Sequence, residues 1–305
     1  MQLRMIILCL AAAAACRADQ STYSSAGQAA PWLAMPTSAQ VAAMGGASVA
    51  FAGSVNALSV NPAGLGRLGT QQLTLMHDAY IEDTSFEHVA YGYPLSKADG
   101  LGASLDYANF GAVPLYAESA AGLSADGTAW PYGLSADLGY GHSIGRVSLG
   151  VNVKFIQESL GQGSVNSTEA ADLGVLWRQH KFVGLSAGAV VQNLGGQLDG
   201  ANLPTTYLGG VGYRMEVTKI QRLALAVDAA VPAAEGSAET LSLGAEYGED
   251  SLWALRAGYR YVGNGGLGGL TAGAGLGYGM LQLDYAYVSE GEFGAANQFS
   301  LSASF

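Results

Sequence analysis

VSLGVNVKF, at residues 147–155, is the stretch that decides the fold. Every second residue is apolar, and Ser, Gly, Asn and Lys stand between the apolar ones. This period of two is the signature of a β-strand with one apolar and one polar face. The alternation returns in LALAVDAAV (residues 223–231), LQLDYAY (residues 281–287) and FSLSASF (residues 299–305). The chain is therefore predicted to be all-β.

Alternating runs of this kind fill the chain from about Gln71 to its end. We count fourteen, which begin near residues 71, 85, 100, 132, 146, 169, 181, 204, 220, 238, 251, 268, 280 and 297. Short turns alternate with longer loops, of which residues 110–131 form the longest. An even number of strands with short turns at one rim and longer loops at the other is typical of an outer-membrane β-barrel. We therefore predict a 14-stranded antiparallel transmembrane β-barrel over residues 71–305.

The two predicted rims differ in charge. The longer loops contain no Lys or Arg and carry Glu118, Asp126, Asp199, Glu235, Glu290 and Glu292, whereas the short turns carry Lys97, Arg146, Lys181 and Lys219. The final Phe305 resembles the C-terminal signal of barrels that the outer-membrane assembly machinery folds. We therefore expect the short turns and the C-terminus on the periplasmic side.

A soluble β-sandwich also alternates and is the alternative fold. The even strand count, the tyrosines near strand ends and the final Phe305 favour the barrel. In lipid, every backbone N–H and C=O must be paired within the protein, and a closed sheet leaves no edge. The apolar face then meets lipid, and the polar face lines the lumen.

The first residues are predicted to be a secretory signal. Arg4 is followed by the uncharged stretch 5–16, which is too short to span a bilayer as a helix. Cleavage after Ala18 is the simplest choice, giving a signal peptide at residues 1–18. AAC at residues 14–16 also resembles a lipobox, so Cys16 is either a lipidation site or a small residue before the cut. In both cases the chain is exported.

Composition excludes several classes of protein. Only 12% of the residues are charged and half are hydrophobic, which excludes a disordered chain. The net charge of −11 argues against binding to nucleic acid, which needs a basic surface. The two cysteines, Cys9 and Cys16, lie in the predicted signal region, which leaves no disulfide framework. The four histidines show no metal-ligand spacing, and no catalytic motif stands out. We therefore expect no metal, no cofactor and no enzyme.

Residues 19–70 do not alternate and are rich in Ala, Gly and Ser. The pair Gly45-Gly46 permits a close approach of backbones, and Asn61-Pro62 starts a turn. Because this segment precedes the first strand, we expect it to fold into the mouth of the barrel as a hatch. Its motif residues are Gly45, Gly46, Asn61, Pro62 and Ala63.

The sequence AMGGASVAFA…NALSVNPAGLG resembles that of the FadL superfamily of outer-membrane proteins. It is similar above all to the PorV/PorQ branch and its uncharacterised relatives of the UPF0164 type. The resemblance implies an N-terminal hatch with an Asn-Pro-Ala motif inside the barrel. It also implies one of two functions, which composition and spacing do not separate. PorV-like members bind secreted proteins in type IX secretion, whereas FadL-like members move hydrophobic small molecules through the lumen to a lateral opening.

Charged residues on the polar parity of the strands are the candidate lumen residues. They carry both signs, so they are either an ion-pair network that holds the hatch or a pore lining that sets selectivity. Arg256 and Arg260 lie four apart on one strand and could meet Asp228, Asp284 or the hatch backbone. The set comprises Asp106, Asp137, Lys154, Asp172, Arg178, Arg214, Asp228, Glu246, Arg256, Arg260 and Asp284.

The longest loop, residues 110–131, is a candidate surface for partners or substrates. We expect a strand such as 123–131 within it. The loop contains Tyr116, Leu123 and Trp130, and either these side chains are exposed and bind a partner or a substrate, or the loop folds inward over the lumen. The leading hypothesis is a non-enzymatic PorV/PorQ-like barrel that binds secreted proteins or components of a secretion system. The alternative is a FadL-like channel for hydrophobic molecules such as long-chain fatty acids, and a third is a structural barrel without transport. Lipid of the outer membrane surrounds the barrel in every case.

Overall fold

The computed structural model describes residues 28–305, apart from residues 81–82, 120–121, 162–164, 180–182, 250–251, 265, 267 and 292–293. The side chains of residues 118–119 and 122–124 are also outside the description. The predicted signal peptide at residues 1–18, Cys16 and the first part of the predicted hatch, residues 19–27, lie outside the described residues and stay predictions.

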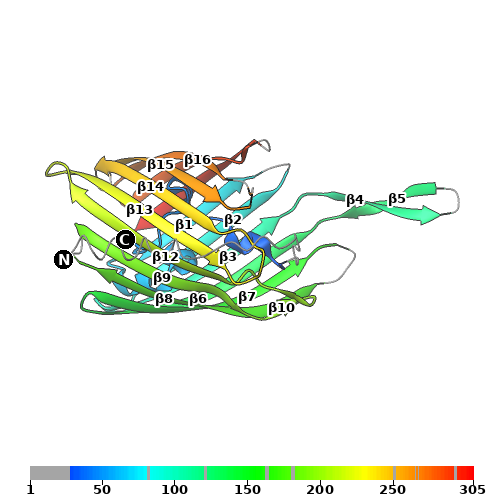
Figure 1. The fold of residues 1–305 in the computed structure, drawn as a ribbon, viewed down its shortest axis with the longest axis horizontal. Coiled ribbons are helices and arrows are strands. Elements are labelled where there is room, and N and C mark those ends of the chain that lie inside the picture. Colours follow the sequence, from blue (N-terminus) through cyan, green and yellow to red (C-terminus); the bar gives the residue numbers. More distant parts are fainter. Residues whose placement is uncertain are drawn as a thin grey trace.

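Fourteen of the described strands close into one antiparallel barrel (Figure 1). Each strand pairs with the barrel strand that follows it in the chain, and β1 pairs with β18 to complete the ring. The predicted fold class is therefore confirmed. The barrel strands are β1 (Gln72–Ala79), β2 (Ser85–Pro94), β3 (Asp99–Asn109), β6 (Tyr132–Ile144), β7 (Val147–Ser159), β8 (Asn166–Arg178), β9 (Gly184–Gly195), β12 (Thr206–Glu216), β13 (Gln221–Pro232), β14 (Thr240–Glu249), β15 (Trp253–Val262), β16 (Gly269–Tyr278), β17 (Leu281–Ser289) and β18 (Ala295–Ser304).

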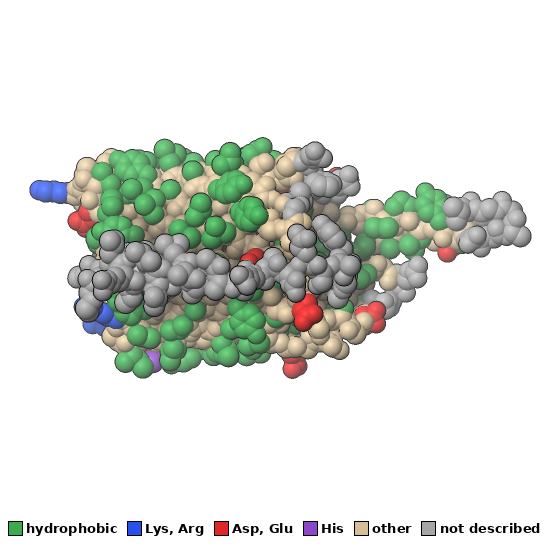
Figure 2. Space-filling view, viewed as in Figure 1, with side chains coloured by type: hydrophobic (Ala, Val, Ile, Leu, Met, Phe, Trp, Pro, Cys, Tyr) green, Lys and Arg blue, Asp and Glu red, His purple; other side chains and the backbone are tan. Residues whose placement is uncertain are grey.

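The alternation seen in the sequence separates the two faces of the wall. On β7, Leu149 and Val153 are 52% and 55% exposed, whereas Ser148, Asn152 and Lys154 are buried. Figure 2 shows apolar side chains over the outer surface of the barrel, with Lys and Arg at the end opposite the β4–β5 hairpin. The apolar face thus points outward, where a bilayer would cover it.

Two further hairpins lie outside the barrel wall. The predicted loop at residues 110–131 forms β4 (Val113–Ser119) and β5 (Gly122–Ala129), which project beyond one end of the barrel (Figure 1). The expectation of a strand hidden in this loop therefore holds, and the structure adds a second strand to pair with it. A smaller hairpin, β10 (Gln197–Leu198) and β11 (Ala201–Asn202), lies in the loop before β12. We call the end with these hairpins the long-loop rim and the opposite end the short-turn rim.

Residues 28–70, which we call the N-terminal segment, contain only short helices. Ala39 donates its N–H to Ser300 Oγ on β18 at 2.8 Å, Ser48 donates to Asp228 on β13 at 2.6 Å, and Asn61 Nδ2 donates to the Val175 carbonyl on β8 at 3.0 Å. Because these strands lie apart around the ring, the segment lies on the lumen side of the wall. Its elements are η1 (Pro31–Ala34), α2 (Ala39–Ala43), α3 (Ala57–Val60) and η2 (Pro62–Arg67).

No described helix is long and apolar enough to cross a membrane.

A charge on the outer face tests whether this surface meets lipid. Leu105 is exposed near the middle of β3, and Leu101 is exposed near the short-turn end of the same strand. We expect Leu105→Arg to lower the free energy of unfolding by about 2–4 kcal/mol and Leu101→Arg by about 0–1 kcal/mol, because the cost falls toward the bilayer surface. Urea titration in lipid vesicles, followed by tryptophan fluorescence, measures both. Equal small costs at the two positions would contradict a membrane-spanning β3.

Candidate functional site

The Asn61-Pro62-Ala63 motif builds a tight turn against the wall. Asn61 is fully buried; its Oδ1 accepts the Ala63 N–H at 3.2 Å, which caps η2, and its Nδ2 donates to the carbonyls of Val175 at 3.0 Å and Val49 at 3.4 Å. Pro62 occupies the first position of η2, where its missing N–H costs nothing. Asparagine and proline therefore fix the turn and attach it to β8.

Glycines of the wall make room for this turn. A Cβ at Gly150 on β7 would overlap the backbone of Pro62 and Ala63, and one at Gly174 on β8 would overlap the Asn61 side chain. Gly141 on β6 meets Gly66 and Leu65 in the same way. Sequence reasoning missed these glycines, although their signal is readable as glycine at lumen-facing positions of consecutive strands.

Gly45 and Gly46 let the chain leave α2 at a sharp angle. Their φ values are +66° and +89°, a conformation that favours glycine, and Gly45 lies against the backbone of Tyr259 on β15. Asp228 then accepts the N–H groups of Ser48 at 2.6 Å and Val49 at 2.8 Å. One carboxylate of β13 thereby satisfies two successive peptide groups of the N-terminal segment.

Two arginines hold the stretch that follows. Arg178 Nη2 donates to the carbonyls of Phe51, at 3.1 Å, and Ala52. The Arg214 guanidinium lies 4.3 Å from the centre of the Phe51 ring, a cation–π contact. Both arginines therefore contact the N-terminal segment.

Uncharged amides add contacts that the candidate set did not include. Gln192 Nε2 donates to the Ser59 carbonyl at 2.6 Å, and Asn152 Nδ2 donates to the Leu58 carbonyl at 3.3 Å. Gln192 projects into the lumen beside a β-bulge, where the β8–β9 register shifts opposite Asp172. Polar amides at lumen-facing positions were the available signal, but the candidate set contained only formally charged residues.

The remaining candidate charges pair mostly with one another across the wall. Lys154 lies 3.0 Å from Asp172 and 2.8 Å from the Asn193 side chain, and Asp106 lies 2.5 Å from His88 Nδ1. Asp137, on the strand between them, accepts from Ser135 and Asn152. These residues form a polar belt on β2, β3 and β6–β9.

Arg256 and Arg260 separate in the structure. Arg256 binds Asp284 at 2.7 Å and Glu246 at 2.6 Å. Asp284 was one of the partners considered from the sequence. Arg256 reaches β17 across β16 because Gly275 stands between and has no side chain to block it. Arg260 instead binds Glu290 at 3.2 Å near the long-loop rim. Neither arginine contacts Asp228, which binds the N-terminal segment.

Two groups outside the strands have shifted pKa values. Burial raises the pKa of the Glu290 carboxyl, and the neighbouring Arg260 opposes this shift. Burial also lowers the pKa of Arg67, whose guanidinium donates to Ser148 Oγ at 2.7 Å and to the Arg146 carbonyl at 2.9 Å. Among the residues that the structure describes, no three His, Cys, Asp or Glu side chains are placed to hold a metal ion.

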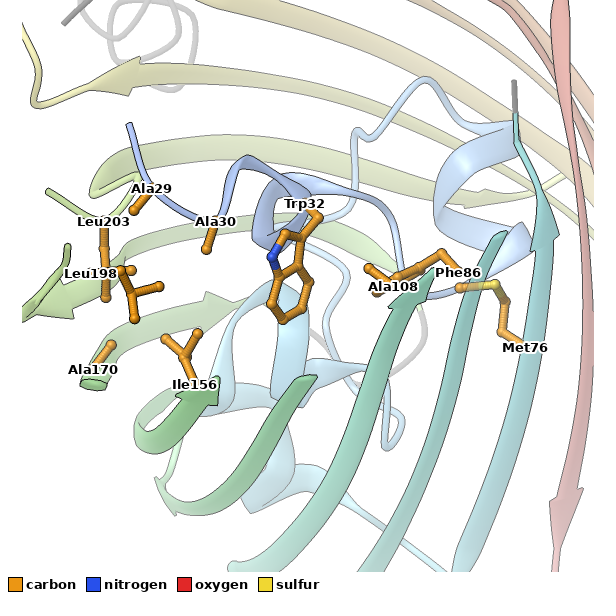
Figure 3. Close-up of a cluster of buried hydrophobic side chains, with 10 residues drawn as sticks. All are labelled: Ala29, Ala30, Trp32, Met76, Phe86, Ala108, Ile156, Ala170, Leu198 and Leu203. Atoms are coloured by element: carbon orange, nitrogen blue, oxygen red, sulfur yellow. The ribbon is translucent and has the colours of Figure 1, made fainter. Parts of the chain in front are cut away.

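An apolar cluster fills the lumen toward the long-loop rim. Trp32 of η1 lies between Phe86 of β2 and Ile156 of β7 (Figure 3). Its indole N–H donates to Glu158 Oε1 at 3.1 Å, which satisfies the one polar atom of the side chain. The N-terminal segment is thus anchored at this end by packing and by the hydrogen bond of Trp32.

Cavities lined by the described residues lie between the N-terminal segment and the wall, and two of them bear on function. The larger, which we call the rim cavity, measures about 220 Å³ and includes Arg222, Glu246, Ala254, Arg256 and Gln282 in its lining. The smaller, the inner cavity, measures about 60 Å³. It is lined mainly by the N-terminal segment, including Val41, Met44, Phe51, Ala57 and Val60.

The family follows from the sequence of the N-terminal part of the chain and the first half of the barrel. The model of UPF0164, described as an uncharacterised protein family, matches residues 8–202. The chain belongs to UPF0164. A search of curated proteins finds no match to this UPF0164 protein.

Solved structures of outer-membrane channels share the fold. The CymD monoaromatic hydrocarbon channel is 14% identical with a TM-score of 0.59, over 88% of this UPF0164 chain and 97% of CymD. The Pseudomonas putida toluene transporter TodX is 14% identical with a TM-score of 0.61, over 87% and 97% of the two chains. A Pseudomonas aeruginosa FadL homologue is 11% identical with a TM-score of 0.51, over 88% and 98%. These likenesses support the FadL-type resemblance, whereas a PorV or PorQ assignment stays a prediction.

Removing the Asp228 carboxylate tests the attachment of the N-terminal segment. Asp228→Ala leaves two backbone N–H groups without their acceptor, so we expect a loss of roughly 1–3 kcal/mol for each buried group left unpaired. Thermal unfolding and limited proteolysis within residues 44–60 measure the loss and the release of the segment. Asp126→Ala, on the exposed β5, is the control and leaves both unchanged. Wild-type protease resistance in Asp228→Ala would contradict the role.

Alanine variants of Arg256 and Arg260 measure how much each arginine contributes to the stability of the protein. Arg256→Ala leaves the buried Asp284 and its neighbour Glu246 without their cation, and we expect it to cost about 3–5 kcal/mol of stability. Arg260→Ala, at a more exposed site, costs clearly less. Urea titrations of both variants give the comparison. Equal costs would show that the Arg256 pair contributes no more than a rim contact.

Proposed function

We propose that this UPF0164 protein is a FadL-like outer-membrane channel for small hydrophobic molecules. Two of the structures that share its fold are those of a monoaromatic hydrocarbon channel and a toluene transporter. The match extends over almost the whole length of those proteins, so nearly every part of their barrels has a counterpart here. These structures are channels and transporters rather than enzymes, which supports a non-enzymatic function.

The inner cavity is the observation that carries the proposal. Its lining combines apolar side chains, among them Val41, Met44, Phe51 and Val60, with polar ones that include Arg214 and Glu246. The apolar part of the lining favours an apolar group of a guest molecule, because transfer of apolar surface out of water is favourable.

We further propose that the N-terminal segment acts as the hatch of this channel, within the predicted boundaries of residues 19–70. Its peptide groups are held by single side chains of the wall, such as Asp228, Arg178 and Gln192. Held in this way, the segment can shift by exchanging a few hydrogen bonds while the barrel stays intact.

A role in protein secretion is the second candidate. The observation that favours it is the β4–β5 hairpin, which projects from the barrel (Figure 1). Tyr116 on β4 is 64% exposed, and Trp130, just beyond β5, is 68% exposed. Exposed aromatic side chains mark surfaces that bind partners. The likeness to hydrocarbon channels supports transport more strongly.

Uptake of radiolabelled toluene by a bacterial host without a channel of this type tests the proposal. We expect cells that make the protein to take up toluene several-fold faster than cells with an empty vector. Val60→Phe fills the inner cavity and lowers the rate, whereas Val60→Ala at the same position keeps it or raises it.

Equal uptake with and without the protein would overturn the proposal. Native mass spectrometry of the purified protein then distinguishes the second candidate, because a co-purified protein without toluene uptake indicates a role in secretion. The amount of folded protein is compared between the variants by the heat-modifiable mobility of the barrel on gels, and uptake rates are compared at equal amounts.

A further inference from the structure

We propose that the rim cavity is a binding site for a small organic cation, a short aliphatic diamine, which enters from the short-turn rim. Binding there requires no hydrophobic solute in the lumen and is therefore independent of the proposed function. The shape of the cavity, the hydrogen-bonding atoms of its lining and the spacing of two glutamates all favour this guest.

The rim cavity lies between the N-terminal segment and the short-turn ends of β13–β17. Toward the middle of the barrel the segment fills the lumen beside these strands, where a Cβ at Gly244 would overlap Met44. Nearer the short-turn rim, the atoms closest to a Cβ at Gly248 or Gly275 belong to the wall. The cavity is thus bounded on its inner side by the N-terminal segment, and its lining ends at the rim with Leu252, which is 51% exposed.

The lining of the rim cavity offers a guest mainly hydrogen-bond acceptors. Its amide donors already point at carboxylates. Gln40 Nε2 donates to Glu246 Oε2 at 3.5 Å, and Gln282 Nε2 donates to the two Asp284 oxygens at 3.0 and 2.9 Å. Among the described residues, no side chain or backbone group donates to the amide oxygens of these glutamines, to Glu246 Oε1 or to the Glu249 carboxylate. Such oxygens are satisfied by a guest that carries N–H donors.

The charges around the cavity favour a cation over an anion. Arg256 is buried and already binds two carboxylates, Glu246 at 2.6 Å and Asp284 at 2.7 Å. The N–H groups that it has left lie beside two negative charges, which repel an anion. Arg222, the other arginine of the lining, lies opposite Glu216 in the β12–β13 register. An ammonium group therefore suits this cavity better than a carboxylate or a phosphate.

Two carboxylates lie at different depths of the cavity. Glu246 lies at the inner end, beside Gln40 of the N-terminal segment, whereas Glu249 is the last residue of β14, at the rim. A strand rises by about 3.4 Å per residue, so the two glutamates are about 10 Å apart along β14. An extended diamine such as 1,4-diaminobutane covers this distance, because each ammonium group adds a hydrogen bond of about 2.8 Å to its carboxylate.

The size of the cavity restricts the guest to a small molecule. Its volume of about 220 Å³ is below the roughly 300–1,000 Å³ of pockets that hold drug-sized ligands. Trp253 adds an aromatic ring to the lining, which also favours a cation. Arg214 lines the inner cavity, and its described contact is with the ring of Phe51.

Isothermal titration calorimetry of the purified protein in detergent tests the site. We expect 1,4-diaminobutane to bind at least about tenfold more tightly than 1-aminobutane, which engages only one glutamate, because a hydrogen bond between two charged groups is worth about that factor. Succinate, an anion of similar length, is expected not to bind. Equal affinity for the diamine and the monoamine, or binding of succinate, would contradict the proposal.

Two variants with matched controls place the binding in the rim cavity. Ala254→Leu narrows the cavity, and Ala257→Leu, on the exposed face of the same strand, is its control. Glu249→Gln removes the charge at the rim, and Glu235→Gln at the exposed long-loop rim is its control. We expect Ala254→Leu and Glu249→Gln to weaken binding of 1,4-diaminobutane about tenfold or more, and both controls to keep the wild-type affinity.

The monoamine gives a further readout. Because 1-aminobutane is expected at the inner Glu246, Glu249→Gln leaves its affinity unchanged while it weakens that of the diamine. Heat-modifiable mobility on gels shows before each titration that the variant is folded. Wild-type affinity for the diamine in folded Ala254→Leu or Glu249→Gln protein would overturn the assignment to the rim cavity.

Toluene uptake by the same protein separates this proposal from the proposed function. A protein that takes up toluene and binds no diamine refutes the cation site alone. A protein that binds the diamine in the rim cavity and takes up no toluene refutes the proposed function alone.

Discussion

The whole structure depends on the pairing of β1 with β18. In this register Gln72 lies opposite Ser304, and Gln71 and Phe305 exchange backbone hydrogen bonds at 3.1 and 3.0 Å just beyond it. An open edge here would leave a row of backbone groups unpaired, which a bilayer does not tolerate. The barrel must therefore close. The closed ring of fourteen strands encloses a lumen that is too wide for the side chains of the wall to fill, whereas side chains alone can fill an eight-stranded barrel.

The N-terminal segment occupies that lumen under a second constraint, the pairing of its own peptide groups. Its helices have at most six residues, so many N–H and C=O groups lack a partner within the helix. The wall supplies those partners through Asp228, Arg178, Gln192 and Asn152. Where the backbones approach most closely, the wall carries glycine instead. The wall therefore accommodates the segment in two ways, with polar side chains that pair its peptide groups and with glycines that leave room for its backbone.

The lumen charges consequently have two roles that their residue types do not distinguish. Asp228 and Arg178 bind the segment, whereas Lys154 with Asp172 and Arg256 with Asp284 brace the wall. The charges that hold the segment and those that brace the wall are thus different residues.

The sequence by itself determined the strands and their two faces. Runs predicted to start near residues 85, 132 and 146 begin at Ser85, Tyr132 and Val147 because a period of two follows directly from the geometry of an extended backbone. It also indicated that Asn61 and Pro62 form a turn, since the required conformations belong to those residue types.

Only the tertiary structure decided which residues meet. Arg256 had several partners of suitable charge, and the register of β15, β16 and β17 together with the missing side chain of Gly275 brings it to Asp284. The sequence indicated only the second strand of the β4–β5 hairpin, because short strands outside the wall have no buried face to impose a clear alternation. Pattern within a strand is local and can be read from the chain, whereas contacts across the lumen depend on closure of the ring, which brings together residues far apart in sequence.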